Sequence, residues 1–148
     1  MFSRKKPQRK RSGTFWYGGI VIINVLIVEP NKLPYEKEIK NTLEEKQKIV
    51  GGFIETTSLL DDDEVVIICN EEGKILNLPL NRDIGHDIIA GTFIVAGDDY
   101  ENGDFKSLTK EQVEKYKEKF GTNSIKETEN KITAILLKNS IKDGRDIN

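Results

Sequence analysis

Four stretches of the chain have the pattern of β-strands, three of them strongly apolar and one, residues 53–58, with mixed faces. The longest is residues 20–28, a run of Ile, Val and Leu interrupted only by Asn24, and such a run is typical of a strand covered on both faces. Residues 53–58, 64–70 and 88–96 are also rich in β-branched side chains. These segments predict a sheet with residues 20–28 as its central strand.

Two other segments have the spacing of amphipathic helices. In residues 35–50 apolar positions recur at helical intervals among Glu and Lys. The glycine pair 51–52 would end this helix, because glycine adopts the left-handed cap conformation without steric cost. Residues 109–120 begin with Thr109 and Gln112 at the spacing of a capping box. The predicted fold class is α+β: a small mixed or antiparallel sheet with two amphipathic helices.

The segment after the third predicted strand has turn chemistry. Asn70 and Gly73 are typical of a tight turn, and apolar residues alternate loosely over residues 75–80. Pro79 has no N–H to donate, which limits this stretch to an edge strand or an extended loop. We therefore predict a hairpin over residues 64–80.

The charged residues are unevenly distributed along the chain. The first 11 residues hold six of the 23 basic residues and none of the 25 acidic ones, so the remainder carries a net charge of −8. The basic residues of this arm are Arg4, Lys5, Lys6, Arg9, Lys10 and Arg11. With 148 residues the chain is long enough for one domain. We expect a disordered basic arm over residues 1–19, one α/β domain over residues 20–121 and a polar extension over residues 122–148, in which only residues 132–137 suggest a further strand or helix.

Residues with catalytic or metal-binding chemistry are scarce. His86 is the only histidine and Cys69 the only cysteine, and they cannot supply the four ligands of a structural zinc site. The acidic runs 61–63 and 98–101 lack the alternating ligand spacing of a calcium loop, and no nucleotide-binding glycine pattern is present. We expect no metal and no cofactor, and a binding protein rather than an enzyme. The alternative is an enzymatic activity that uses carboxylates and Arg82.

The number of cysteines and the length of the apolar runs indicate where in the cell the protein works. A single cysteine excludes an intrachain disulfide, which fits a reducing compartment. No stretch reaches the roughly 20 apolar residues of a membrane span. The basic arm and the apolar run behind it imitate a secretory signal, but Asn24 interrupts the run and no small-residue cleavage site follows. We expect a cytoplasmic protein without membrane contact.

Residues 70–82 combine amides, carboxylates and a guanidinium around apolar positions. Arg82 offers a planar fork of five donors that suits phosphate or carboxylate, and asparagine presents a donor and an acceptor together. One interpretation is a binding site built from Asn70, Glu71, Asn81 and Arg82. The other is that the asparagines shape turns while Arg82 pairs with a nearby acid.

The middle of the chain resembles the family known as domain of unknown function 3846, over roughly residues 22–120. The ordered motifs are Ile49–Glu55 (IVGGFIE), Ile68–Lys74 (ICNEEGK), Leu78–Arg82 (LPLNR) and Asp87–Phe93 (DIIAGTF), with further likeness at Val25–Pro30, Asp104-Phe105 and Ser107-Leu108. The resemblance carries motif positions over to Asn70, Glu71, Gly73, Pro79, Asn81, Arg82, Gly91 and Thr92. Two features depart from the family: Asn77 stands where glycine is common, and the stretch between Arg82 and Asp87 is short. The resemblance implies an accessory protein of phages, plasmids and integrated elements of Gram-positive bacteria.

Two functions from different classes follow. The first is a non-enzymatic accessory protein that counteracts host defence by sequestering a small anionic signal or a host protein, with Thr92 added to the binding residues by the resemblance. The alternative is a nucleic-acid-binding accessory protein whose basic arm contacts phosphates and whose nearby aromatic residues 15–17 stack on bases. A DNA mimic is disfavoured, because 17 basic residues dilute the acidic body.

Overall fold

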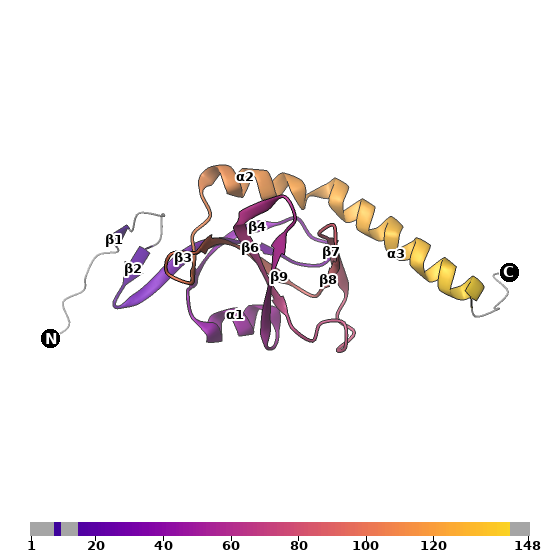
Figure 1. Ribbon diagram of the computed structural model, residues 1–148, viewed down its shortest axis with the longest axis horizontal. Helices are drawn as coiled ribbons and strands as arrows, with labels where there is room; N and C mark the ends of the chain where they lie inside the picture. Colours follow the sequence, from indigo (N-terminus) through magenta and orange to yellow (C-terminus); the bar gives the residue numbers. More distant parts are fainter. Residues whose placement is uncertain (1–7, 10–14, 143–148) are drawn as a thin grey trace.

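The computed structural model describes residues 8–9 and 15–142 of the chain, with side chains over residues 18–141. Its centre is an antiparallel sheet in the order β4-β3-β9-β6-β5, which β1, β2 and β10 extend at one end (Figure 1). The strands of the sheet are β1 (Gln8–Arg9), β2 (Phe15–Tyr17), β3 (Ile20–Val28), β4 (Tyr35–Lys40), β5 (Ile54–Leu59), β6 (Asp62–Asn70), β9 (Phe93–Asp99) and β10 (Asp104–Lys106). Together with the helices described below, this confirms the predicted α+β class.

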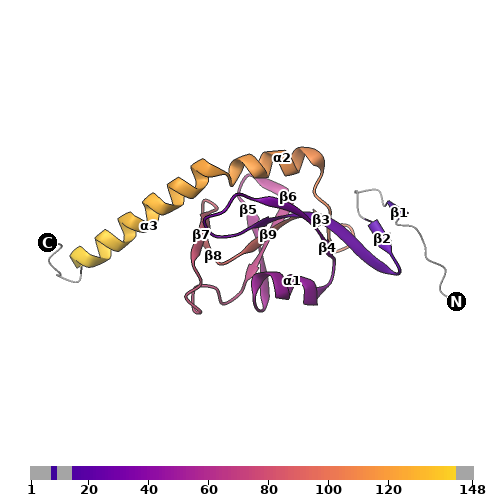
Figure 2. The same cartoon turned by 180° about the vertical axis from the view of Figure 1, so that it is seen from behind.

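Both faces of the sheet are covered. The helix α1 (Leu43–Val50) packs on one face, and α2 (Lys110–Lys119) with the separate hairpin of β7 (Leu80–Asp83) and β8 (Ile88–Ala90) packs on the other (Figures 1 and 2). Alternate residues of β3 accordingly enter different cores: Val25 contributes to the core on the α1 side and Leu26 to the core on the α2 side. This two-sided burial explains the unbroken apolar run.

The position of β3 differs slightly from the prediction. It is an interior strand, paired with β4 on one side and with β2 and β9 on the other. The middle strand of the five is β9, which lies between β3 and β6. The predicted arm over residues 1–19 includes β2, which pairs with β3 through Trp16 and Val21. The domain boundaries otherwise stay a prediction.

The prediction of one helix over residues 35–50 is wrong in its first half. Tyr35–Lys40 forms β4 and pairs with β3 along six positions, burying only Ile39. The helix starts later because Thr42 caps it, its side-chain oxygen accepting from the backbone N–H of Glu45 at 3.2 Å. Because this strand has a single buried side chain among charged residues, its sequence shows no apolar period that would distinguish a strand from a helix.

The predicted hairpin over residues 64–80 is also wrong. β6 pairs with β5 and β9, whereas β7 pairs with β8. Residues 71–77 form consecutive turns between β6 and β7. Hydrogen bonds inside this segment, such as Leu78 N–H to the carbonyl of Gly73 at 2.9 Å, replace the ladder that a hairpin would have formed.

The two remaining features of the chain are the predicted second helix and the C-terminal extension. α2 has the full capping box between Thr109 and Gln112 that its sequence predicted. The extension is more regular than expected: α3 (Thr122–Lys142) is one continuous helix that starts beside β7 and projects past the sheet (Figure 1).

Candidate functional site

Arg82 lies on β7 and is fully buried. All five of its N–H donors have acceptors. Nε and Nη2 donate to the carbonyl of Phe120 at 3.2 and 3.0 Å, and Nη2 also donates to the carbonyl of Lys32 at 2.6 Å. Nη1 donates to the carbonyl and the side-chain oxygen of Asn81 at 3.3 and 2.8 Å. The guanidinium therefore joins β7, the β3–β4 turn and the end of α2.

No carboxylate is among these acceptors, so carbonyl dipoles balance the buried charge. Phe120 is the residue that ends α2, and the partial negative charge at a helix C-terminus stabilises a cation. Burial lowers the pKa of Arg82 from its ordinary value. This geometry differs from pairing with a nearby acid, and it leaves no N–H of Arg82 directed at solvent for an anion.

Asn81 completes the same network. Its side-chain nitrogen donates to the carbonyl of Val28 at 2.8 Å and to that of Gly91 at 2.9 Å, while its oxygen accepts from Arg82. Asn81 is itself buried. It ties the end of β3 to the residues that precede β9, so the two neighbouring motif positions act as one structural unit.

Asn70 plays the equivalent part on the opposite face of the sheet. Its side-chain nitrogen donates to the carbonyl of Val50, the last residue of α1, at 3.1 Å, and its oxygen accepts from the N–H of Glu72 at 2.8 Å. Gly52 lies so close to this amide that an added Cβ would be 3.0 Å from its nitrogen. Asn70 thus holds the end of α1 against the start of the loop after β6.

The structure does not bring the predicted binding residues into one exposed site. Asn70 contacts the helix on one face of the sheet, whereas Asn81 and Arg82 contact the helix on the other. Glu71 is exposed, and Thr92 is half-buried immediately before β9. Whether any of them touches a ligand or a partner stays a prediction.

These buried side chains fix both ends of one exposed loop, residues 71–79. Two close approaches hold it further. A Cβ on Gly73 would lie 2.6 Å from the carbonyl oxygen of Ala90, and Gly91, at a φ of +82°, would place a Cβ 2.8 Å from Leu78. Lys74 of the loop also forms an ion pair with Asp87. These contacts place the backbone of the loop against the residues that precede β9.

The loop presents apolar side chains to solvent. Ile75 and Leu76 are 79% and 52% exposed, and Phe53, whose carbonyl accepts from the N–H of Glu71 at 2.8 Å, is 64% exposed beside it. We call Phe53, Ile75 and Leu76 the loop surface. Exposed loops on a rigid scaffold often carry binding residues.

Sequence reasoning missed a second exposed apolar feature, which is on α3. Its first half is anchored to the body: Thr128 is buried and accepts from the backbone N–H of Asp83 at 3.3 Å, and Lys131 forms an ion pair with the Asp83 side chain. Beyond this point Ile135 and Leu136 are exposed. The signal in the sequence was the apolar run of residues 132–137 between two lysines.

Lys46 is a further residue whose role the sequence did not indicate. It is buried on α1, where its Nζ donates to the side-chain oxygen of Asn41 at 2.6 Å and to the carbonyl of Thr42 at 3.3 Å, and lies 4.7 Å from the centre of the Phe105 ring. Burial lowers the pKa of Lys46, and the charge of Asp104 acts in the opposite direction. The contacts give Lys46 a structural role at the start of α1.

Cys69 and His86 are the single cysteine and the single histidine of the chain. Cys69 is buried in β6, and burial and the neighbouring Glu55 raise the pKa of its thiol to about 12. His86 lies in an exposed turn with its Nε2 3.3 Å from the Thr57 hydroxyl. Over residues 15–142 no cluster of three or more His, Cys, Asp or Glu side chains is placed to hold a metal ion, and no helix is long and apolar enough to cross a membrane.

The basic arm lies almost entirely outside the described residues. Arg4, Lys5, Lys6, Lys10 and Arg11 lie outside the described residues, and only the backbone of Arg9 is described, in β1. Nucleic-acid contacts by the basic arm stay a prediction.

Comparison with known proteins gives one match. No curated protein and no solved structure matches the chain. The family model described as Domain of unknown function (DUF3846) matches residues 23–121, which include the buried network of Asn70, Asn81 and Arg82 and the loop it supports. The match ends one residue before α3 begins. It spans about two thirds of the sequence, and the chain belongs to the DUF3846 family.

Proposed function

We propose that this chain is a non-enzymatic accessory protein of a phage or mobile element that counteracts host defence by binding a host protein through the loop surface. The observation that supports this proposal is the loop itself: Ile75 and Leu76 are exposed on a segment whose two ends are held by buried side-chain hydrogen bonds. A preorganised loop loses little conformational entropy when it binds, which favours affinity.

Sequestration of a small anion is the weaker form of the proposal. Arg82 is the group that would have recognised phosphate or carboxylate, and its donors are occupied by the carbonyls of Phe120 and Lys32 and by Asn81. Releasing them to an anion would leave buried carbonyl groups without donors. A protein partner at the loop surface requires no such rearrangement.

The test compares the full chain with a matched pair of variants. Ile75→Asp combined with Leu76→Asp places charges on the loop surface, whereas Leu60→Asp places one on a residue that is 77% exposed in the β5–β6 turn. We expect the wild type and the Leu60 variant to retain the same host protein during purification, and the loop variant to lose it at an unchanged melting temperature. Retention by all three proteins would exclude the loop surface.

A second candidate function rests on the charge of the arm. Six basic residues without an acidic one precede residue 12, and each phosphate contact adds to the salt dependence of nucleic-acid binding. Deletion of residues 1–11 should abolish DNA or RNA binding and its salt dependence. Absence of binding by the intact chain at low salt would remove this candidate.

A further inference from the structure

The turn between β9 and β10 contains a residue pair with chemistry of its own. Asn102 is followed by Gly103, and an Asn-Gly pair occurs only here in the sequence. Asp99 and Asp104 pair at the end of the hairpin, so Asn102 and Gly103 lie in the exposed turn that joins the two strands. Asparagine is one of the chemically labile residues of proteins, and glycine after it leaves the backbone nitrogen without a shielding side chain.

Gly103 is exposed, and its backbone nitrogen is weakly held. Its φ is +59°, and a Cβ placed there would meet no described atom within 4 Å apart from its two chain neighbours. The N–H donates to the carbonyl of Tyr100 at 3.4 Å, which is longer than the roughly 2.7–3.2 Å of most such bonds. A long hydrogen bond costs little to break, so the nitrogen of Gly103 is available for reaction.

The side chain of Asn102, by contrast, is held by a hydrogen bond. Its Nδ2 donates to Oδ2 of Asp99 at 2.8 Å. This bond fixes the orientation of the amide, and rotation of the amide toward the nitrogen of Gly103 has to release it first. A carboxylate that accepts from an amide nitrogen also polarises that amide and makes its carbon less reactive toward a nucleophile. Asp99 therefore makes the contact through which the fold slows a reaction of Asn102.

We propose that Asn102 is a site of spontaneous deamidation and that its hydrogen bond to Asp99 sets the rate. The backbone nitrogen of Gly103 loses its proton and attacks Cγ of Asn102, and the new C–N bond closes a succinimide ring. The bond between Cγ and Nδ2 breaks, and Nδ2 takes up a proton and leaves as ammonia. Water then opens the ring at either carbonyl, which leaves aspartate or isoaspartate at position 102. Nothing is oxidised or reduced, and water is the co-reactant.

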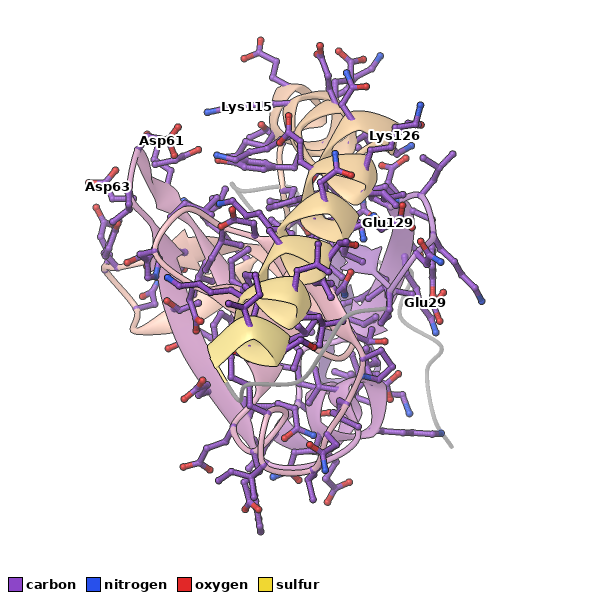
Figure 3. All side chains as sticks on the ribbon, turned by 90° about the vertical axis from the view of Figure 1, so that its right-hand side faces the viewer. Glu29, Asp61, Asp63, Lys115, Lys126 and Glu129 are labelled. Atoms are coloured by element: carbon purple, nitrogen blue, oxygen red, sulfur yellow. The ribbon has the colours of Figure 1, made fainter. Side chains whose placement is uncertain are left out.

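The product of this reaction adds a negative charge to a region that is already acidic. Asp61 and Asp63, at the β5–β6 turn and the start of β6, lie to the left of α3 in Figure 3. Desolvation and then the charges of Asp63 and Asp98 raise the pKa of Tyr100, so these carboxylates act on the β9–β10 turn. Like charges at short range repel. Deamidation should therefore lower the stability of this end of the sheet.

Peptide mapping by mass spectrometry of the full chain, stored in mildly alkaline buffer, tests the proposal. We expect the peptide with Asn102 to gain the mass difference between a hydroxyl and an amino group, more slowly in the native protein than in urea. Asn123, which is exposed and followed by Ser124 within α3, is the control and should stay unchanged in the native protein. Asn102→Gln should remove the signal, because the longer side chain has to close a larger and less favourable ring.

Two variants separate the hydrogen bond from the general effect of negative charge. Asp99→Ala should accelerate the native reaction roughly fivefold, the ratio that corresponds to about 1 kcal/mol for one hydrogen bond. Asp98→Ala removes the neighbouring carboxylate, leaves the bond to Asn102 in place and should have a clearly smaller effect. In urea both variants should react like the wild type, and circular dichroism checks that both fold.

Two results would overturn the proposal. If Asn102 stays unchanged in the native protein while the denatured chain reacts, the fold protects this position and it is no modification site. If Asp99→Ala and Asp98→Ala react at the same rate in their native states, the hydrogen bond from Asn102 to Asp99 does not set the rate.

Discussion

The guanidinium of Arg82 donates two hydrogen bonds to the carbonyl oxygen of Phe120, the residue at which α2 ends. A cation on a strand thereby satisfies a carbonyl that has no partner within its helix, and it also reaches the carbonyl of Lys32 in the β3–β4 turn. Three segments distant in the sequence are joined at one side chain. The stability of the fold should therefore depend on the shape of this side chain as well as on its charge.

Replacing Arg82 with lysine should destabilise the protein by about 3–5 kcal/mol, the usual cost of breaking a buried charged network. A single ammonium group cannot reach the carbonyls of Phe120 and Lys32 and the oxygen of Asn81 together. Urea denaturation of Arg82→Lys against the wild type measures the loss. An unchanged free energy of unfolding together with weaker ligand binding would instead support the anion-binding interpretation of Arg82.

Asn70→Ala should lower the free energy of unfolding by about 1–3 kcal/mol, because the carbonyl of Val50 and the N–H of Glu72 both lose their partner. Hydrogen exchange should show the end of α1 opening more often. Glu71→Ala, one residue further at an exposed position, is the control and should leave both measurements unchanged. Equal destabilisation by the two substitutions would contradict the role assigned to Asn70.

Asp62 should contribute to acid sensitivity. Burial raises the pKa of its carboxyl, but hydrogen bonds from Tyr116, the Glu64 N–H and Lys115 outweigh burial and hold that pKa below its usual value. A carboxyl with a lowered pKa stabilises the folded state above its unfolded pKa of about 4 and loses this effect as the pH falls through the folded pKa. Denaturation between about pH 6 and pH 2 should therefore show a shallower acid loss for Asp62→Asn than for the wild type. The exposed Asp63→Asn serves as the control, and an identical pH profile for wild type and Asp62→Asn would refute the assignment.

Cys69 should be unreactive in the folded protein. Its thiol is buried, and burial and Glu55 raise its pKa to about 12, so almost no thiolate exists at pH 8. A thiol reagent at pH 8 should label the chain only after denaturant is added, with a stoichiometry of one. Labelling of the native protein at the rate of a free thiol would show that this part of β6 opens readily.

Local patterns determined much of the architecture. The run from Ile20 to Val28 indicated a strand covered on both faces, and Thr109 with Gln112 indicated where α2 begins, because such signals depend on neighbours in the sequence. The family resemblance likewise rested on short ordered motifs and was confirmed over residues 23–121.

Tertiary structure alone decided the roles of the polar motif residues. By residue type, Asn70 and Arg82 carry hydrogen-bond donors that suit a ligand site. In the structure these donors bind the backbone carbonyls at the ends of α1 and α2. Tertiary pairing also made Tyr35–Lys40 a strand, since its partner β3 precedes it and its own pattern is ambiguous. The exposure of Leu136 depends on where the body ends beneath α3. Hydrogen-bond partners and burial are set by segments far apart in the chain, so residue type and spacing alone do not specify them.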